Sequence, residues 1–332
     1  MSGRRVLITG ATGGLGTALV REALTRGHDV LATGRSRAQG ERLVALGAQF
    51  EPLDLTDSDA DLCGLVDGFS SVIHAAALSA SWGPARAFEA ANVSATRRLL
   101  AAATERGVRR FVFVSSPSIF ARHADRIGIG EHEAPAPTPL NHYARTKLAA
   151  EQWVLTRRDG GPACVAIRPR ALVGPGDRVI LPRLIELARR KRMPLPRGGA
   201  ARIELTDLRD AAWATCEAEA RASDLHGRAI NISGGDPVSV REVAQRLAAA
   251  LGESPTLVTL PVGLAIPIAH LLEAVARLAG ARKEPVLTRY TLATLAWSQT
   301  FDLEPAQRLL GYVPRHDALA TLLDAARRGG AA

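Results

Sequence analysis

Short apolar runs alternate with amphipathic stretches through the first half of the chain. The apolar runs predict β-strands at 6–9, 30–33, 49–53, 72–74, 111–114 and 164–167. Apolar residues at helical spacing predict helices at 15–26, 36–46, 84–105 and 141–153. Strands that alternate with helices in this way predict an α/β fold with a doubly wound parallel sheet of the Rossmann type.

The regular alternation fades beyond residue 168, where prolines punctuate loops and short helices. One more strand is predicted at 229–233 and a surface helix at 240–251. We therefore expect a dinucleotide-binding domain at 1–168, with a returning segment at about 203–235. A smaller, partly discontinuous C-terminal substrate-binding lobe then takes 169–202 and 236–332.

The segment 254–272 carries no formal charge, yet it contains three prolines, and Glu273 and Arg277 follow it at once. A membrane-spanning helix needs about 20 mainly apolar residues. We interpret the segment as buried or pocket-lining. Peripheral membrane contact is the alternative, and a membrane span is disfavoured.

The positive charge of the chain is carried almost wholly by arginine. The net charge is +9, from 42 Lys and Arg against 33 Asp and Glu, and the only lysines are Lys147, Lys191 and Lys283. Such a bias in an alanine-rich chain indicates coding composition more than a nucleic-acid surface, so we expect no nucleic-acid partner. The basic run at 189–192 is interpreted as a solvated helix end.

Cysteine usage and the N-terminus indicate the compartment. Cys63, Cys164 and Cys216 are scattered and form no C-x-x-C pair, so neither a zinc site nor a disulfide framework is indicated, and we expect no metal. Glycines interrupt the first apolar run from Gly10 onward, and no cleavage region closes it as in a signal peptide. We therefore expect a cytoplasmic protein.

A glycine-rich loop joins the first predicted strand to the first predicted helix. It consists of Gly10, Ala11, Thr12, Gly13, Gly14, Leu15 and Gly16. Glycines at such a turn let the backbone approach a pyrophosphate, and the helix N-terminus supplies N–H donors and the positive end of its dipole. The loop therefore predicts a dinucleotide site; a plain flexible turn is the alternative.

The end of the second strand indicates which dinucleotide binds. NAD-selective sites usually place an acidic residue there to accept a hydrogen bond from the ribose. Here the turn carries Arg35 and Arg37 and no acid, and Arg35 can pair with a 2′-phosphate through its guanidinium. We expect NADP(H) in preference to NAD(H). Asp54 and Leu55, after the third strand, either flank the adenine or form a plain polar cap.

Tyr143 and Lys147 lie four residues apart on a predicted helix and so share one face. With three tyrosines and three lysines in the chain, such a pair is expected about 0.03 times by chance. A phenol has a pKa of about 10, and a neighbouring ammonium lowers it, so Tyr143 can exchange a proton with a carbonyl oxygen. A hydroxyl from Ser115, Ser116 or Ser118 can hold the same oxygen. An amphipathic tyrosine beside a solvated lysine is the alternative.

Further motifs extend the pattern over nearly the whole chain. The chain resembles the extended short-chain dehydrogenase/reductase superfamily in the glycine loop, the Tyr–Lys pair, Asn92, and residues 74–77, 114–116 and 168–169. The second half is similar to the 3β-hydroxysteroid dehydrogenase-like branch at 168–177, 181–184, 284–289 and 304–314. Within that branch the sequence is most similar to the bacterial 2-alkyl-3-oxoalkanoate (β-keto-acid) reductases of olefin biosynthesis.

The resemblance implies a catalytic set of Ser116, Tyr143 and Lys147, with Ser115 as the weaker choice for the serine. It also implies that the cofactor is lined by the glycine loop and by Arg35, Asp54, Leu55, Ala75, Ala76, Ser115, Tyr143, Lys147 and Pro169. A homodimer through two helices of the nucleotide domain is usual in the superfamily and is one option here. Phe120 and Ala121 stand where many sugar-modifying relatives have Tyr-Gly, which argues against a nucleotide-sugar substrate.

Together these features predict an NADP(H)-dependent oxidoreductase. It would move a hydride between nicotinamide and a ketone or secondary alcohol of a small hydrophobic substrate, either sterol-like or an alkylated β-keto acid. The few charges of residues 257–300 fit an apolar pocket, and equally an ordinary lobe core. One alternative is a nucleotide-sugar epimerase or dehydratase with tightly bound NAD. Another is a non-catalytic NADP-sensing regulator, against which the Tyr–Lys pair counts.

Overall fold

A seven-stranded parallel sheet dominates the computed structural model, which describes residues 3–157, 160–177 and 180–330. The strand order is β12-β7-β5-β4-β1-β2-β3, which confirms the predicted Rossmann-type fold. The strands are β1 (Arg5–Thr9), β2 (Asp29–Gly34), β3 (Gln49–Pro52), β4 (Ser71–His74), β5 (Arg110–Val114), β7 (Ala163–Pro169) and β12 (Ala229–Ile232). The chain first adds β2 and β3 on one side of β1 and then adds β4 and the later strands on the other side. In such sheets a ligand crevice lies beyond the carboxyl ends of the two strands at this switch point, here β1 and β4.

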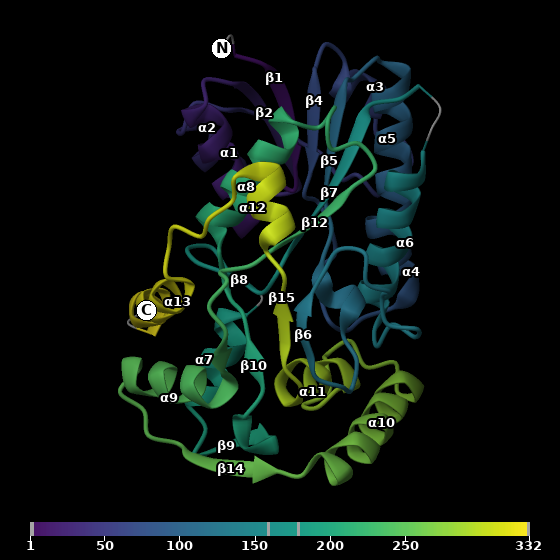
Figure 1. Ribbon diagram of the computed structural model, residues 1–332. Helices are drawn as coiled ribbons and strands as arrows, with labels where there is room; N and C mark the ends of the chain where they lie inside the picture. Colours follow the sequence, from purple (N-terminus) through teal and green to yellow (C-terminus); the bar gives the residue numbers. More distant parts are fainter. Residues whose placement is uncertain (1–2, 158–159, 178–179, 331–332) are drawn as a thin grey trace.

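Helices cover both faces of this sheet (Figure 1). One face carries α1 (Gly14–Thr25), α2 (Arg37–Val44), α8 (Leu208–Ala220) and α12 (Glu304–Leu310). The other carries α3 (Leu62–Val66), α5 (Ala95–Glu105) and α6 (His142–Thr156). Successive β1 side chains alternate between the two cores, with Ile8 in the first and Leu7 in the second. Burial on both faces explains why the strands are continuous apolar runs in the sequence.

The helix expected at 84–105 is interrupted. It consists of α4 (Ala85–Phe88), the π-helical turn η1 (Glu89–Ser94) and α5. The wider turn directs Asn92 toward the loop after β4, where its side chain makes hydrogen bonds. π-Helical turns often occur at functional sites, and the hydrophobic spacing does not distinguish them from a regular helix.

The smaller lobe lies beyond the carboxyl ends of the main sheet (Figure 1). Its sheet has the order β13-β10-β15-β6, while β14 pairs with β9 and β11 with β8. Its strands are β6 (Arg126–Ile129), β8 (Leu172–Val173), β9 (Arg192–Pro196), β10 (Arg202–Ile203), β11 (Thr206–Asp207), β13 (Val238–Ser239), β14 (Thr256–Leu260) and β15 (Gln299–Phe301). Its helices are α7 (Leu181–Ala188), α9 (Val240–Ala250), α10 (Val262–Leu278), α11 (Arg289–Ala296) and α13 (Ala318–Gly330), with short 3-10 turns η2 (Pro117–Phe120) and η3 (Arg197–Gly199).

Two elements join regions that the sequence analysis assigned to different domains. β6, from the first half of the chain, pairs with β15 in the small sheet. α12, from the C-terminal part, packs Ala306 and Leu310 into the core of the nucleotide domain. The segment expected to return at about 203–235 includes α8 and β12, which add a helix and an edge strand to the larger unit. The division into domains stays a prediction.

The uncharged segment 254–272 forms β14 and most of α10, and its interpretation as buried is wrong for the outer face of the helix. Leu264, Ile268 and Leu271 are 63%, 46% and 63% exposed, whereas Ala265 and Ala269 are buried. Within the described chain, no helix combines the length and apolar character that crossing a bilayer requires. Residues 189–192 follow the end of α7 and are exposed, which confirms the solvated helix end.

Candidate active site

The turn between β1 and α1 requires glycine at two positions. Gly10 has a φ of +67°, and a Cβ there would lie 2.6 Å from the backbone of Ala76. A Cβ on Gly16 would lie 2.1 Å from the carbonyl oxygen of Gly10. Cβ atoms do not come this close to backbone, so the loop keeps its shape only with glycine at both positions.

The N-terminus of α1 opens directly onto this loop. The helix begins at Gly14, and its N-cap residue, Gly13, has no side chain that could cap the first turn. The first N–H groups of a helix have no partner within the helix itself. A pyrophosphate binds to such free N–H donors where glycines let it approach the backbone. This cradle therefore fits the expected dinucleotide. Thr12 closes it on one side, where a Cβ on Gly34 would lie 2.7 Å from the Thr12 Oγ1.

The ends of β2 and β3 bring three expected cofactor residues together. Arg35 follows β2 and its side chain is exposed, while Leu55, which follows β3, is buried. Hydrogen bonds from Thr56 hold the pKa of Asp54 below its usual value, and the nearby charge of Arg35 acts in the same direction. Arg35, Asp54 and Leu55 therefore lie side by side next to the glycine cradle.

The loop after β4 is fixed to β1 through Thr9. The N–H of Ala75 donates to the Thr9 carbonyl oxygen and that of Ala76 to the Thr9 Oγ1, both at 3.3 Å. The same Oγ1 bonds the Nδ1 of His74 at 2.7 Å. Burial lowers the pKa of His74 to about 3, and the charge of Lys147 acts in the same direction. The imidazole is therefore neutral near pH 7, and its role is to hold the loop.

Asn92 connects this loop to α6. Its Oδ1 accepts from the N–H of Leu78 at 2.7 Å, and its Nδ2 donates to the Oγ1 of Thr146 at 3.0 Å. Thr146 precedes Lys147 on α6. The asparagine therefore sets the position of the helix that carries the Tyr–Lys pair relative to the loop that carries Ala75 and Ala76.

The carboxyl end of β5 brings its serines to Tyr143. Ser116 lies close enough to the phenol of Tyr143 to lower its pKa, against the larger effect of burial. Ser116 also accepts from the N–H of Ser118 at 3.2 Å. The buried hydroxyls of Ser115 and Ser118 have no hydrogen-bond partner within the described residues. This arrangement favours Ser116 over Ser115 as the partner of the phenol.

The phenol of Tyr143 holds its proton firmly. Burial raises its pKa to about 12, against the opposing influence of Ser116, and the nearby Tyr290 adds to the rise. This direction is opposite to the lowering that the sequence analysis expected from a neighbouring ammonium. The difference follows from desolvation, which outweighs the other influences on this half-buried side chain.

The ammonium of Lys147 is bound to the end of β5. Its Nζ donates to the carbonyl oxygen of Val114 and lies 4.2 Å from the centre of the Phe113 ring. Burial lowers the pKa of Lys147 to about 7, and the carboxylate of Glu151 partly opposes this shift. Near neutral pH the lysine therefore exchanges readily between its charged and neutral forms.

Glu151 also forms a buried ion pair with Arg168, which the sequence analysis missed. The Nε of Arg168 lies 2.8 Å from one carboxylate oxygen of Glu151 and its Nη2 lies 2.5 Å from the other. This bidentate pair joins α6 to the end of β7, whose last residue is Pro169. The available signal was the spacing of four between Lys147 and Glu151, which places both on one helix face.

The smaller lobe adds charged groups close to this region that sequence reasoning did not single out. The carboxylate of Glu284 accepts a hydrogen bond from Ser81 at 2.6 Å and pairs with Arg183. Burial raises the pKa of Tyr290, while Arg170 and Arg183 oppose the rise. These side chains come from segments far apart in the chain, so no local pattern links them.

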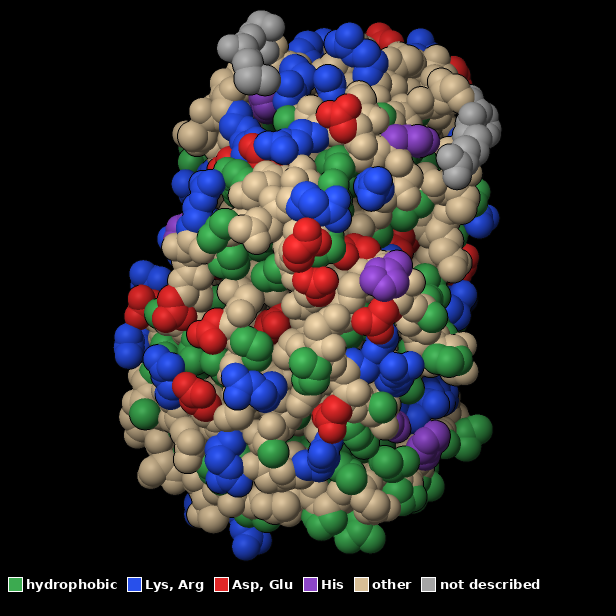
Figure 2. Space-filling model, viewed as in Figure 1, with side chains coloured by type: hydrophobic (Ala, Val, Ile, Leu, Met, Phe, Trp, Pro, Cys, Tyr) green, Lys and Arg blue, Asp and Glu red, His purple; other side chains and the backbone are tan. Residues whose placement is uncertain are grey.

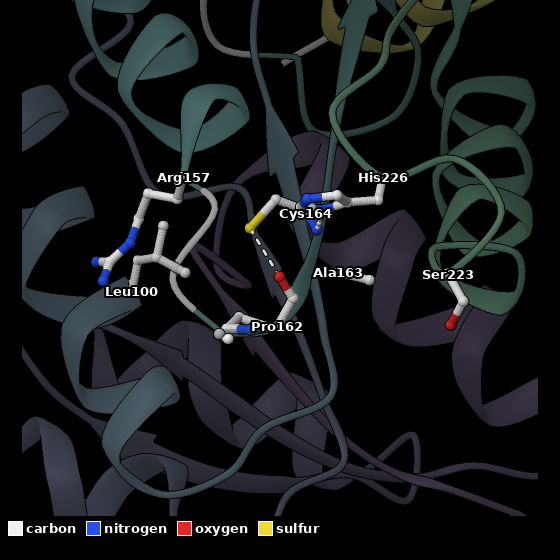
Figure 3. Close-up of a pocket in the computed structure, with 9 residues that line it drawn as sticks. Leu100, Arg157, Pro162, Ala163, Cys164, Ser223 and His226 are labelled. Carbon is white, nitrogen blue, oxygen red and sulfur yellow. Dashed lines mark hydrogen bonds between the residues drawn. The ribbon is translucent and has the colours of Figure 1, made fainter.

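A surface pocket lies at the amino end of β7, opposite to the carboxyl end that carries the candidate site (Figure 3). At the start of β7, the thiol of Cys164 donates to the carbonyl oxygen of Pro162 at 3.3 Å, and the Cys164 N–H donates to the Nδ1 of His226 at 3.0 Å. Dinucleotides bind at the carboxyl ends of parallel strands, so this pocket is not the cofactor site. Within the described residues, no group of three or more His, Cys, Asp or Glu side chains is placed to hold a metal ion.

Comparisons with known proteins agree with this geometry. A model of the NAD dependent epimerase/dehydratase family matches residues 6–233. The 2-alkyl-3-oxoalkanoate reductase of Stenotrophomonas maltophilia is 36% identical over 316 residues, which cover 94% of this chain and 95% of that protein. The 3beta-hydroxysteroid-dehydrogenase/decarboxylase isoform 1 of Arabidopsis thaliana is 30% identical over 288 residues, covering 83% of this chain and 65% of that protein.

A solved structure shows the same overall fold. MoeE5 in complex with UDP-glucuronic acid and NAD superimposes with a TM-score of 0.76 at 28% identity, covering 98% of this chain and 99% of that one. These similarities confirm the resemblance to extended short-chain dehydrogenases/reductases and its 3β-hydroxysteroid dehydrogenase-like branch. The chain therefore belongs to the NAD dependent epimerase/dehydratase family and is an NAD(P)-dependent oxidoreductase of the extended short-chain type.

Proposed function

We propose that this chain is an NADPH-dependent reductase of the ketone in a hydrophobic β-keto acid, with Ser116, Tyr143 and Lys147 as its catalytic residues. The observation that carries the proposal is that Ser116, just beyond the carboxyl end of β5, lies close to the phenol of Tyr143, one helical turn before Lys147. A hydroxyl pair at this edge of the sheet is suited to bind the oxygen of a carbonyl group and to give it a proton.

The protonation states of the site favour reduction. With its pKa raised to about 12 by burial, Tyr143 is a phenol at neutral pH and has a proton to give. NADPH, when bound, supplies the hydride that reduces the ketone carbon. The phenol proton then goes to the carbonyl oxygen, and Ser116 holds that oxygen in place. Lys147, with its pKa lowered to about 7 by burial, stands one helical turn away as a source of positive charge.

NADP(H) rather than NAD(H) is part of this proposal. Arg35 is exposed at the end of β2, where an acidic residue would select for NAD. Its guanidinium is suited to pair with a 2′-phosphate. The carboxyl group of Asp54 lies close to Arg35 and keeps a low pKa, owing first to the hydrogen bonds from Thr56. Asp54 follows β3 and so does not form the acidic ribose contact at the end of β2.

The substrate class is inferred from the relatives. The Stenotrophomonas protein, whose name gives 2-alkyl-3-oxoalkanoate as its substrate, matches this chain almost from end to end. A β-keto acid with an alkyl branch presents a ketone, a carboxylate and apolar chains. These groups require a proton donor, a cation and an apolar wall respectively.

A substrate assay with NADPH tests this function. The protein is expected to oxidise NADPH in equal amount with the formation of a 3-hydroxy acid from a 2-alkyl-3-oxoalkanoate. A 3-keto sterol is the comparison substrate and is expected to react more slowly. If neither ketone is reduced while NADP(H) binds tightly, the non-catalytic regulator is the better description.

A nucleotide-sugar epimerase or dehydratase is the second candidate, favoured by the similarity to MoeE5 in complex with UDP-glucuronic acid and NAD. It predicts that purified protein carries tightly held NAD and that a UDP-sugar raises its melting temperature. Release of NADP(H) instead of NAD on denaturation, with no thermal shift from UDP-glucuronic acid, would exclude it.

We further propose that the outer face of α10 contacts an anionic lipid surface. Its exposed apolar residues are spaced every three or four positions along one stripe: Leu264, Ile268, Leu271, Val275 and Leu278. They protrude from the end of the lobe, at the lower right of Figure 2. The exposed Arg282 and Lys283 follow the helix and complement anionic headgroups. A protruding apolar helix face bordered by basic side chains is typical of interfacial binding.

Co-sedimentation with vesicles of phosphatidylglycerol and phosphatidylcholine tests this contact. The chain is expected to sediment with the anionic vesicles, and Leu264→Gln/Leu271→Gln is expected to remain in the supernatant. Val44→Gln, an exposed residue on α2, is the matched control and is expected to sediment as the unaltered chain does. Equal sedimentation of the double variant and the unaltered chain would contradict the lipid contact. Loss of dimerisation in the double variant would show that a second protein copy covers this face instead.

A homodimer and a cytoplasmic location complete the proposal. α5 and α6 lie on the same face of the sheet and are the two helices through which we propose that two chains associate. Cys63, Cys164 and Cys216 are unpaired, as is usual in a reducing compartment. Light scattering is expected to give twice the 35.1 kDa chain mass, and a mass of one chain would contradict the dimer.

A further inference from the structure

A buried arginine whose Nε has no hydrogen-bond partner among the described residues directly follows the last strand of the site. Arg170 comes directly after Pro169, the last residue of β7, and only 7% of it is exposed. Its Nε is buried without a hydrogen-bond partner, and within the described residues the guanidinium makes neither a hydrogen bond nor an ion pair. A buried charge is costly unless it is paired, so an unpaired one requires a reason.

The backbone holds Arg170 firmly in this place. Its N–H donates to the carbonyl oxygen of Ile232 at 2.8 Å, and its own carbonyl oxygen accepts from the Oγ1 of Thr206. The next residue, Ala171, has a φ of +39°, in a region that residues with a Cβ rarely adopt. Strained backbone of this kind persists where surrounding structure fixes it, and it occurs often at ligand sites.

The nearest acidic candidates are engaged elsewhere. Glu204 is close enough for its charge to raise the pKa of Arg170, although burial, the larger influence, lowers it. The carboxylate of Glu204 instead accepts from the N–H of Phe301, at 3.3 and 3.4 Å, and makes a hydrogen bond with Ser233. Burial raises the pKa of Glu204, which weakens it further as a counter-charge.

The acid on the lobe side is engaged as well. Glu284, the acid near Tyr290, is already paired with Arg183. Glu284 is taken by Arg183 and Glu204 by the N–H of Phe301, so among the described residues neither carboxylate forms an ion pair with Arg170. An anion that enters here would meet one unpaired guanidinium.

Arg170 lies close to the proton donor of the site. The N–H of Ser115 donates to the carbonyl oxygen of Ile167 at 2.7 Å, so the ends of β5 and β7 run side by side. Tyr290 connects the two groups electrostatically. Burial raises the pKa of Tyr290, and the charge of Arg170 opposes this rise. Burial also raises the pKa of Tyr143, and Tyr290 adds to that rise. The guanidinium and the two phenols therefore border one region beyond the strand ends.

We propose that Arg170 binds the carboxylate of the substrate while its ketone lies at Tyr143. In a β-keto acid one carbon separates the carboxyl group from the ketone, so the cation must stand near the proton donor. Arginine suits a carboxylate because its planar fork can donate two parallel hydrogen bonds. The inference rests on the proposed ketone reduction and adds to it the group that selects the free acid over neutral ketones.

A pair of substrates that differ only at the carboxyl group tests the proposal. The unaltered chain is expected to reduce a 2-alkyl-3-oxoalkanoate with a kcat/KM about 10- to 100-fold above that of its methyl ester, the range expected for a hydrogen bond to a charged group. Arg170→Gln is expected to abolish this preference, and Arg170→Lys to restore part of it. The control Arg192→Gln, at an exposed residue, is expected to keep the full preference. A preference that survives Arg170→Gln overturns the proposal.

Stability separates a binding role from a structural one. Because the guanidinium is buried and unpaired, Arg170→Met is expected to melt at the same temperature as the unaltered chain or higher. A structural arginine would give the opposite result. A clear fall in melting temperature together with an unchanged acid preference would show that Arg170 supports the fold only.

A binding measurement keeps the inference distinct from the proposed reaction. Titration calorimetry with octanoate and with 1-octanol, in the presence of NADP⁺, needs no turnover. Octanoate is expected to bind at least tenfold more tightly than 1-octanol, and Arg170→Gln is expected to remove the difference. If the chain reduces no ketone but shows this difference, the proposed reaction fails and the carboxylate site stands. Equal binding of both probes to the unaltered chain overturns the carboxylate site.

Discussion

The ammonium of Lys147 donates a hydrogen bond to the carbonyl oxygen of Val114, at the end of β5. This contact holds the lysine against the end of β5, which Ser115 and Ser116 follow directly. Burial is the main influence on both ionisable groups of the helix: it raises the pKa of Tyr143 and lowers that of Lys147. The site therefore combines a protonated phenol with a lysine that titrates near neutral pH.

Lys147 makes the stability of the fold depend on pH in a defined direction. Burial lowers its pKa to about 7, from 10.5, so between these values the unfolded chain binds a proton that the folded chain lacks. The free energy of unfolding therefore rises with pH over this window, by at most about 1.4 kcal/mol per pH unit. Urea unfolding at pH 7, 8 and 9 measures the slope. Lys147→Met is expected to lose this contribution, and an identical slope in the variant would contradict it.

Removing only one partner of the ion pair between Glu151 and Arg168 is expected to lower the free energy of unfolding strongly. Both side chains are buried, so Glu151→Gln leaves an unpaired guanidinium and is expected to cost about 3–5 kcal/mol of unfolding free energy. The double variant Glu151→Leu/Arg168→Met removes both charges and is expected to lose much less. Denaturant unfolding of the single and double variants measures both values. A double variant as unstable as Glu151→Gln would show that packing rather than charge pairing matters here.

Two glycines of the cradle, Gly13 and Gly16, differ in whether they tolerate a side chain. A Cβ on Gly16 would lie 2.1 Å from the Gly10 carbonyl oxygen, whereas a Cβ on Gly13 would lie 3.4 Å from the same atom. Gly16→Ala is expected to cost about 1–3 kcal/mol of stability through overpacking, and Gly13→Ala close to nothing. Thermal unfolding without added nucleotide measures both. Equal melting temperatures for the two variants would contradict the crowding at Gly16.

The nucleotide half of the candidate site can be proposed from the sequence because its residues are local. The loop Gly10–Gly16 and the pair Tyr143 and Lys147 are each set by one turn or one helix, so spacing alone reveals them. The parallel, doubly wound sheet likewise follows from the alternation of strands and helices.

The lobe half of the site is not readable in this way. Arg170, Glu284 and Tyr290 come together only through the tertiary structure, and nothing in their spacing signals contact. Charge-free composition likewise predicted burial for α10, because it does not reveal which face of a helix meets the protein. The raised pKa of Tyr143 depends on burial, which the Tyr–Lys spacing does not report.

Cofactor preference is expected to depend on Arg35. Arg35→Ser is expected to raise the KM for NADPH about 10- to 100-fold, because it removes a charge-assisted contact to the 2′-phosphate, and to leave the KM for NADH unchanged. Arg42→Ser, at an exposed position on α2, is the matched control. Steady-state kinetics with both nucleotides measure the effect. An unaltered chain that uses NADH as well as NADPH would show that Arg35 does not select the cofactor.

The most direct test of the account is the rate of hydride transfer in a single turnover with Tyr143→Phe. With saturating NADPH and a 2-alkyl-3-oxoalkanoate, the loss of the phenol proton is expected to slow the decay of NADPH absorbance by about 100- to 10,000-fold, the range of general acid catalysis. Tyr312→Phe, which removes a buried hydroxyl bound to the Ser233 carbonyl oxygen, is expected to keep the rate of the unaltered chain. An undiminished rate in Tyr143→Phe would contradict the central claim that this phenol is the acid of the reaction.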